Sequence, residues 1–175
     1  MAIPTQATLT VGSSTIQNRM IALLNGIWYR GALTSTVSHT TARYRSLKLD
    51  TQIAGENLTE SFSGDCLTGL DGVYDIRAKV SYPANTTGYR GLLLGVNPSA
   101  TTVDATSDLT YGTTLEQAIA FGISGADNIV EVGPVRCRLV ASDTVMLRAY
   151  QNSGSSLTLP TDGSKVFLQI AKVAE

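Results

Sequence analysis

One stretch decides the fold of this 175-residue chain: GVYDIRAKVSY, residues 72–82. Its apolar residues recur at every second position from Tyr74 to Tyr82, and the positions between them carry Asp, Arg, Lys and Ser. This period of two predicts a β-strand with one buried face and one solvent-exposed face.

The pattern continues outward from this stretch. Further apolar or alternating stretches lie at 92–96, 135–139, 145–150, 157–159 and 165–173. Residues typical of turns separate them, such as PANTTG at 83–88 and NSGS at 152–155. Short strands joined by such turns predict an all-β fold, an antiparallel sandwich or barrel.

The composition suits one globular domain and excludes several classes of function. The chain has 43% hydrophobic and 15% charged residues and a net charge of −1, so no electrostatic bias favours nucleic acid or an anionic membrane. No stretch approaches the roughly 18 uncharged apolar residues of a membrane span, and residues 1–5 do not resemble a secretory signal. We expect a soluble protein made in the cytoplasm, with no nucleic-acid or membrane partner.

The N-terminal region departs from the strand pattern. Residues 14–17, STIQ, resemble a helix capping box, and apolar residues follow at helical spacing up to Ile27. The same residues could also form a strand. Residues 34–41, rich in Ser and Thr, read as a linker or an extended strand. We therefore divide the chain into an N-terminal arm, residues 1–45, and a body, residues 46–175.

A second departure is the long polar connection at 99–125. Its residues 115–119 could form one or two helical turns. A connection of this length inside a compact domain is typical of a functional loop or of a segment that contacts a partner.

The chain carries no recognisable catalytic, cofactor-binding or metal-binding motif, so we expect neither an enzyme nor a cofactor. Nucleophilic catalysis needs a base beside the nucleophile. The single histidine, His39, lies in a Ser/Thr-rich stretch and is predicted to be a surface residue. The only cysteines, Cys66 and Cys137, are predicted to be buried free thiols.

Three arginines could form a basic stripe with Tyr150: Arg136, Arg138 and Arg148. Such a stripe would be compatible with nucleic-acid binding. The interpretation we favour is that they lie on solvated outer strand faces or form salt bridges to a neighbour.

Several stretches of the body, in order, resemble the C1q/TNF-like jelly-roll family. Residues 72–82 resemble its G-x-Y-x-I/F-x-A-x-V strand, and residues 143–154, DTVMLRAYQNSG, resemble its D-x-V-x-L-x-x-Y-Q-N-S-G strand and turn. The stretch 85–92 is similar to a turn and strand of phage and bacterial members, and 166–170 has the place of the last, central strand. The resemblance implies an antiparallel jelly-roll sandwich for the body.

The resemblance also implies a homotrimer around a threefold axis. It places Tyr150, Phe167 and Gln169 near that axis, as the trimer interface; the alternative is that Tyr150 and Phe167 belong to the sandwich core. The insertion at 99–125 and the lack of a collagen-like or coiled-coil stalk favour a phage virion relative over the secreted vertebrate members.

The first functional hypothesis is a capsid decoration, or cement, protein of a tailed bacteriophage. Its trimer would sit on the capsid surface of the virion, bind the major capsid protein and stabilise the head. Apolar residues of a detached arm need a partner to cover them. The capsid-anchoring residues would then be Ile16, Met20, Leu23, Ile27, Trp28 and Tyr29. The alternative is that this segment packs on its own body.

The second hypothesis is a receptor-binding module of a tail fibre or tip. The loops of the trimer would then bind a glycan or protein on the host surface, with Tyr89 and Tyr111 as the exposed aromatic candidates. A bacterial surface adhesin of C1q type is a third, weaker possibility, because the chain has no recognisable secretory signal.

Overall fold

The computed structural model describes residues 29–49, 51–55, 61–63, 66–97, 104–105 and 113–174. Within these ranges the chain forms strands, turns and loops, and no helix. The strand pairings among these residues are all antiparallel. The predicted all-β antiparallel class is therefore confirmed.

A five-stranded sheet forms one layer, and we call it the β7 sheet. In spatial order its strands are β11 (Asn128–Leu139), β7 (Gly72–Tyr82), β14 (Val166–Ala174), β1 (Tyr29–Ala32) and β4 (Thr51–Gly55). The stretch that opened the analysis is β7. The strand predicted to be last and central is β14, which lies between β7 and β1.

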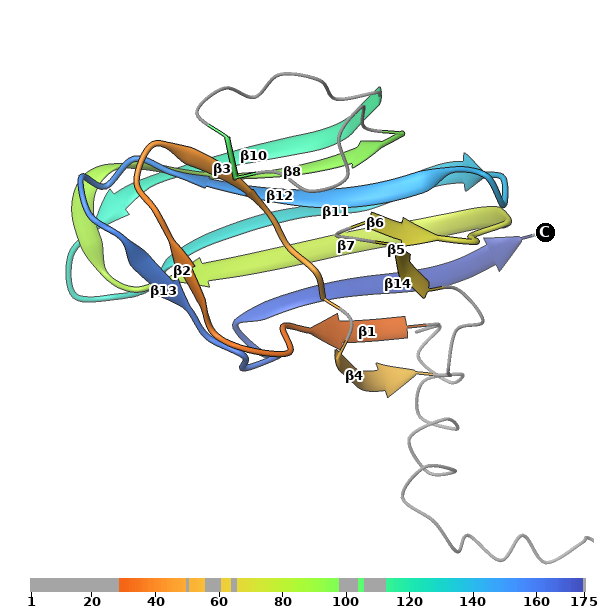
Figure 1. Ribbon diagram of the computed structural model, residues 1–175, viewed down its shortest axis with the longest axis horizontal. Coiled ribbons are helices and arrows are strands. Elements are labelled where there is room, and N and C mark those ends of the chain that lie inside the picture. Colours follow the sequence, from red (N-terminus) through yellow and green to blue (C-terminus); the bar gives the residue numbers. More distant parts are fainter. Residues whose placement is uncertain are drawn as a thin grey trace, which may run out of the picture.

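The second layer, the β8 sheet, faces the first. In spatial order it contains β10 (Thr113–Ile123), β8 (Asn85–Val96), β12 (Thr144–Gln151), β3 (Arg43–Ser46) and β9 (Asp104–Ala105). At one end of β12, β6 (Cys66–Thr68) adds to the sheet and pairs in turn with β5 (Ser61–Ser63). A separate two-stranded sheet joins β2 (Val37–His39) to β13 (Leu157–Leu159). In Figure 1, β10, β8 and β12 lie above β7, β14, β1 and β4.

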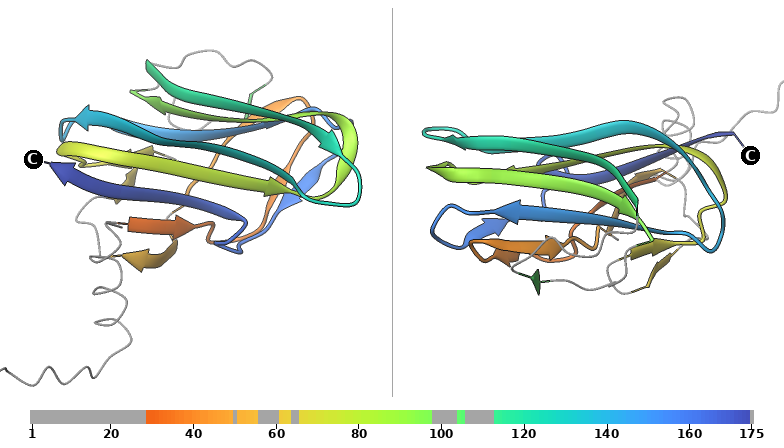
Figure 2. Two further views of the ribbon diagram at one scale, coloured as in Figure 1. Left: turned by 180° about the vertical axis from the view of Figure 1, so that it is seen from behind. Right: turned by 90° about the horizontal axis from the view of Figure 1, so that it is seen from above.

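Consecutive long strands cross between the layers. The steps from β7 to β8, from β10 to β11 and from β11 to β12 each lead from one sheet to the other, as Figure 2 shows for β10 and β11. Apart from the β5–β6 pair, strands that are neighbours in a sheet are therefore not consecutive in sequence, as in a jelly roll.

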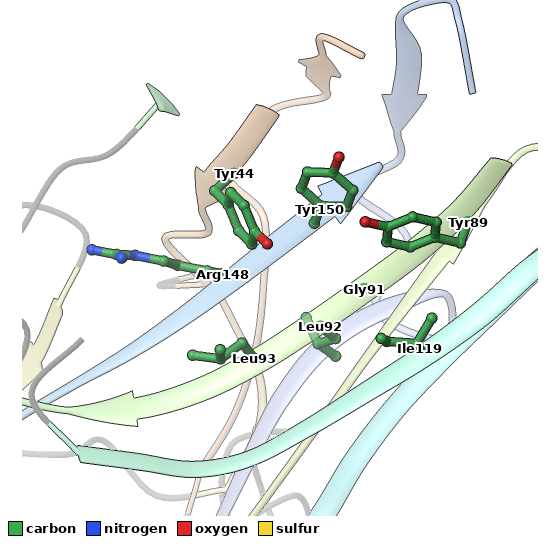
Figure 3. Close-up of a pocket in the computed structure, with 8 residues that line it drawn as sticks. All are labelled: Tyr44, Tyr89, Gly91, Leu92, Leu93, Ile119, Arg148 and Tyr150. Carbon is green, nitrogen blue, oxygen red and sulfur yellow. The ribbon is translucent and has the colours of Figure 1, made fainter. Parts of the chain in front are cut away.

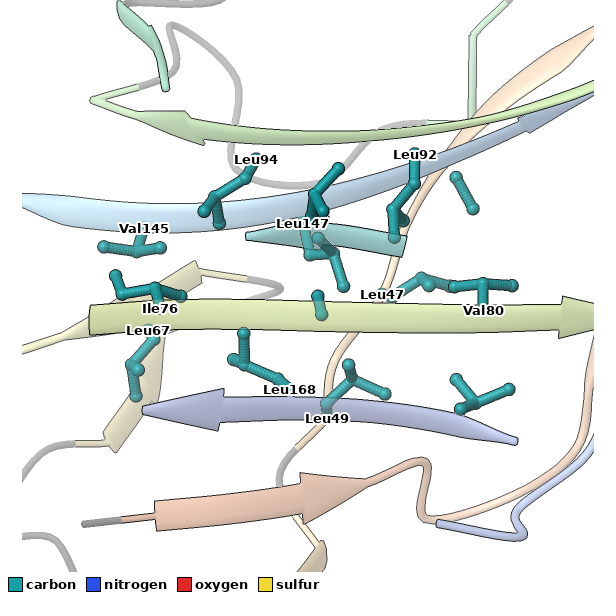
Figure 4. Close-up of a cluster of buried hydrophobic side chains, with 14 of the residues drawn as sticks. Leu47, Leu49, Leu67, Ile76, Val80, Leu92, Leu94, Val145, Leu147 and Leu168 are labelled. Carbon is teal, nitrogen blue, oxygen red and sulfur yellow. The ribbon is translucent and has the colours of Figure 1, made fainter. Parts of the chain in front are cut away.

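The core fills the space between the two inner faces. From β7, Ile76 and Val80 point inward; from the other layer, Leu92, Leu94 and Leu147 meet them (Figure 4). These side chains are the alternate, apolar positions that the period of two predicted. Full burial of each such side chain contributes about 1.5–3 kcal/mol.

A buried arginine fixes the first residues of β8. Arg90 occupies an inward position of β8 and is fully buried. Its Nη1 donates hydrogen bonds to the carbonyl oxygens of Thr87 (3.0 Å) and Tyr89 (3.1 Å), and its Nη2 to that of Asn85 (3.3 Å). Burial lowers the pKa of Arg90 from its ordinary value. The guanidinium thereby replaces lost hydration with three backbone carbonyls.

The prediction of a surface histidine is wrong, because His39 is fully buried. Its strand β2 pairs with β13, where His39 is opposite Leu157. The Nε2 atom lies 2.8 Å from the carbonyl oxygen of Arg43, which can only accept, so Nε2 carries a hydrogen. The Nδ1 atom lies 3.2 Å from the Tyr82 hydroxyl. A polar local sequence did not reveal this burial, because it follows from a pairing with a distant strand.

Both cysteines were predicted to be buried free thiols. Cys137 is a free thiol, half-buried against the core. Burial, followed by the charges of Asp75 and Asp143, raises the pKa of this thiol. The side chain of Cys66 lies outside the described part of the chain.

The helical turns suggested for 115–119 are wrong, since these residues lie in β10. Pairing with β8 extends from Thr113, opposite Val96, to Ile123, opposite Asn85. Cross-strand pairing of this length overrides the weak local preference for helix.

The sandwich also begins earlier than the predicted boundary at residue 46. β1 pairs with β14 and β4, and β3 pairs with β12, so residues 29–45 contribute strands to the body. Any boundary between arm and body must lie before Tyr29. Residues 1–28 lie outside the described ranges.

Two glycines offer a test of this packing. At Gly122 in β10, an added Cβ would lie 2.4 Å from the carbonyl oxygen of Asn85 and 2.8 Å from the carbonyl carbon of Thr86. At Gly91 in β8, the nearest atom would be the Tyr150 Cβ, at an ordinary 3.5 Å. We expect Gly122→Ala to lower the free energy of unfolding by about 1–3 kcal/mol. Gly91→Ala should leave it unchanged or raise it by up to about 1 kcal/mol. Urea unfolding of both variants is the measurement, and equal stability would contradict the close approach at Gly122.

Candidate interaction surfaces

An aromatic row crosses the outer face of the β8 sheet. Ile119 of β10 is opposite Gly91 of β8. Tyr150 of β12 is opposite Gly91 on one side and Tyr44 of β3 on the other. Because Gly91 has no side chain, the row has a gap between Ile119 and Tyr150. A hollow of about 60 Å³ lies there, and we call it the tyrosine hollow.

Tyr150 is the centre of three packed rings beside this hollow. Its ring centroid is 4.5 Å from that of Tyr44 and 5.2 Å from that of Tyr89, and the Tyr89 ring is stacked at 27° to it. In Figure 3 the hydroxyls of Tyr44 and Tyr89 point toward Tyr150. The remaining lining residues are Gly91, Leu92, Leu93, Ile119 and Arg148. The hollow thus combines aromatic walls with hydroxyl groups.

Among the described residues that line the hollow, Arg148 is the one with a charged group. The guanidinium of this residue points away from the tyrosine rings in Figure 3, and its Nε donates to the Met146 Sδ at 2.9 Å. Arg148 is buried, so the prediction that it lies on a solvated face is wrong. Burial, and then a hydrogen bond with the Tyr89 hydroxyl, raise the pKa of Tyr150. Its ring therefore stays neutral throughout the physiological range.

A second surface is an exposed apolar strip along one side of the sandwich. β10 and β11 are the edge strands of their two sheets. Phe121 is 78% exposed, and Ile119 and Ile123 of the same strand and Ile129 of β11 are also exposed. Exposed edge strands with apolar side chains are sites where another chain can dock. We call these four residues the edge strip.

On the outer face of the β7 sheet, charged side chains lie over the aromatic ring of Phe167. Phe167 is buried because the Arg30 guanidinium lies 4.2 Å and that of Arg77 5.8 Å from its ring centroid. Gln169 is opposite Arg30 on one side and Arg77 on the other. Arg77 also pairs with Glu131.

The residues predicted for the trimer interface lie on opposite faces of the protomer. Phe167 and Gln169 alternate with the core residues of β14, and so face outward from the β7 sheet. Tyr150 alternates with the core residues of β12, and so faces outward from the β8 sheet. The alternative, in which Tyr150 and Phe167 belong to the core between the sheets, is wrong. Their role at an interface stays a prediction.

The other predicted site residues fall into two groups. The side chains of the predicted capsid-anchoring residues lie outside the described part of the chain, and so does Tyr111. Among the anchoring residues, only Tyr29 has a described backbone, which belongs to β1. The three arginines form no single stripe, since Arg136 and Arg138 belong to β11 and Arg148 to the other sheet. The Arg136 guanidinium forms a bidentate salt bridge with the Asp75 carboxylate. The Nε–Oδ1 and Nη2–Oδ2 distances are both 2.8 Å. This salt bridge lies within the chain, and a salt bridge to a neighbour stays a prediction.

Sequence reasoning missed Tyr44, Ile119 and Phe121. A usable signal existed for β10, because Ile119, Phe121 and Ile123 alternate with small residues. Tyr44 gave no comparable signal, since its partner Tyr150 is more than a hundred residues away in sequence.

Among the described residues, no group of three or more His, Cys, Asp or Glu side chains is placed to hold a metal ion. In the same part of the chain, no helix has the length and apolar character needed to cross a membrane.

Comparison with known proteins identifies the architecture. No protein-family model matches the sequence, and no curated protein matches it. Solved structures do match. Murine APRIL at pH 5.0 superposes with a TM-score of 0.60 at 13% identity, covering 83% of this chain and 97% of that one. Eiger TNF from S. frugiperda gives 0.53 at 12% identity, covering 84% and 90%. At these identities the likeness shows the fold alone: the chain is an antiparallel jelly roll of the C1q/TNF-like type.

Proposed function

We propose that this chain is a non-enzymatic structural protein of a phage virion, whose homotrimers decorate and stabilise the capsid. The observation that carries the proposal is the edge strip on a TNF-like sandwich. A large apolar side chain as exposed as Phe121, on an edge strand, favours a further protein surface over water. The first step of the proposal is therefore self-assembly.

The positions of the apolar and charged surfaces favour a ring. The edge strip lies on one side of the sandwich, and the predicted axis residues Phe167 and Gln169 lie on the outer face of the β7 sheet. A contact between two different surfaces of the same chain is heterologous, and such contacts close into rings when the rotation allows. An edge-to-face contact of this kind would give a threefold ring and would use Phe167 and Gln169, but not Tyr150.

A trimer of this form suits the threefold or quasi-threefold sites of a phage head. The apolar residues of the N-terminal arm, among them Met20, Leu23 and Trp28, supply the attachment in this proposal. Because β1 begins at Tyr29, the arm precedes the sandwich directly, and its attachment need not disturb any described strand.

The second candidate is a receptor-binding module of the phage tail. The tyrosine hollow favours it, since aromatic rings with hydroxyl groups on an outer face are typical of recognition sites. Immunogold labelling of intact virions separates the two candidates. Label over the heads supports decoration, and label at the tail tip supports receptor binding.

Phe121→Asp tests the assembly step. A carboxylate buried without a partner costs several kcal/mol, so we expect the dissociation constant of the trimer to rise by on the order of 100-fold or more. Light scattering after size-exclusion chromatography measures the change in mass. Val140→Asp is the matched control, because Val140 is also exposed (49%) but lies beyond the edge strip, after β11. Dissociation by both variants alike, or a monomeric parent protein, would contradict the assignment.

Deletion of residues 1–28 tests the attachment step. The deletion leaves every described strand in place, so we expect a folded trimer that no longer binds capsids lacking the protein. Co-sedimentation with such capsids measures binding, and circular dichroism with light scattering measures fold and mass. A shortened trimer that binds as well as the full chain would rule out the arm as the anchor.

A further inference from the structure

We propose that the outer face of the β7 sheet binds a free oxyanion of the phosphate class, held by Arg30, Gln169 and Arg77. This inference deepens the proposed function and rests on it in one respect, since the next copy in the ring would cover this face. The row of donors itself belongs to a single protomer, so the site can be tested whether or not the ring forms.

The three side chains form a row across neighbouring strands. Arg30 of β1 is opposite Gln169 of β14, and Gln169 is opposite Arg77 of β7; the three strands lie side by side in Figure 1. Phe167 faces outward two residues before Gln169. The guanidinium carbons of both arginines lie over its ring, 4.2 and 5.8 Å from the centroid. The donors therefore gather on one face, around one aromatic ring.

These donors have hydrogen-bonding capacity that the rest of the described chain leaves unused. The Arg30 Nη2 donates to the Gly163 carbonyl oxygen at 3.0 Å, whereas its Nε is buried without a hydrogen-bond partner among the described residues. Arg77 uses its Nε for Glu131. Within the same part of the chain, the Gln169 amide has no hydrogen-bond partner. Unused donors beside a buried one are unfavourable unless an acceptor binds them.

The charge of Arg30 is not compensated by a carboxylate. Among the described residues, the salt bridges on or beside this face are Arg77–Glu131, Lys165–Asp127 and Arg136–Asp75. None of them includes Arg30. In the proposed ring, the apolar edge strip of the next copy would displace water from this guanidinium. A charge that is buried without a counter-ion is costly, so the contact calls for an anion.

A free anion fits this position better than a carboxylate of the next copy. The edge strip belongs to β10 and β11, and the acidic side chains described on β11 and on the turn before it are Glu131 and Asp127. Both are already engaged, Glu131 by Arg77 and Asp127 by Lys165 and Ser81. A small oxyanion breaks neither salt bridge. Its several oxygens can also accept from donors on three different strands.

The strands themselves do not need these polar groups. Gln169 lies in the middle of β14, an inner strand of its sheet, where β-branched and aromatic residues are favoured. Covering the Phe167 ring requires only a long aliphatic stem, which lysine also has. The guanidinium of Arg30 adds a planar fork, which matches the oxygens of a phosphate or carboxylate. Replacement of this arginine by lysine therefore separates the fork from the charge.

Isothermal titration calorimetry with sodium phosphate tests the site on the full-length protein, at a fixed chloride concentration. We expect Arg30→Lys to weaken phosphate binding about tenfold or more, because the charge remains but the fork is lost. Gln169→Leu should weaken it about threefold to tenfold, since one hydrogen bond is removed. Arg136→Lys is the matched control. Arg136 is exposed on the same sheet and pairs with Asp75, so this variant should bind phosphate like the parent protein.

Light scattering separates the anion site from the ring. We expect phosphate to lower the dissociation constant of the parent trimer by about tenfold, because it binds the assembled state more tightly. The dissociation constant of Arg30→Lys should change much less. A monomeric parent protein that binds phosphate through Arg30 would contradict the ring and would support the site.

Three results would overturn the proposal. The first is the absence of phosphate binding by both calorimetry and thermal shift. The second is equal phosphate affinity in the parent protein and in folded Arg30→Lys and Gln169→Leu. The third is dissociation of the trimer by phosphate, which would show that a carboxylate of the next copy occupies the site. Melting temperature is measured for every variant, and Gln169→Leu carries the test if Arg30→Lys does not fold.

Discussion

Burial of alternate side chains between the β7 and β8 sheets is the constraint on which the rest of the molecule depends. Because successive residues of a strand point to opposite faces, each inward Ile76 or Leu92 commits its neighbours to the outside. The core thereby decides which residues can act as surface: Tyr150 faces outward because Leu147 and Ala149 on its strand face inward. A slip of one residue in any long strand would exchange core and surface.

From the sequence alone, we could predict those strands in which apolar and polar residues alternate. The strands β7, β12 and β14 and their all-β context follow from residues that are close together in the chain. The edge strand β10 and the buried His39 could not be found in this way, since pairing with β8 and with β13 determines them. The same holds for the candidate site. Tyr89 was recognisable as a loop-side aromatic, but the row that contains Tyr44 and Gly91 depends on strand register.

Two of the surfaces of the protomer adjoin each other, because Phe121 of the edge strip is opposite Tyr89 of the hollow, and the third lies on the other sheet. The edge strip involves mainly β10 and β11, the charged face around Phe167 belongs to the β7 sheet, and the tyrosine hollow opens on the β8 sheet. Ile119 is the one residue shared by the edge strip and the hollow. In the proposed ring, assembly would cover the first two surfaces and would reach the rim of the hollow, because Ile119 lines it and Phe121 is opposite Tyr89.

Arg90 makes one end of the tyrosine hollow insensitive to acidity. An arginine keeps its charge in proteins at every pH at which they stay folded, and the carbonyl groups it holds do not titrate. The backbone carbonyl of Tyr89 is one of them. The tyrosine that closes one end of the hollow is thus anchored by bonds without a proton-dependent partner, and the end of the hollow that it forms should keep its shape in both acidic and neutral surroundings.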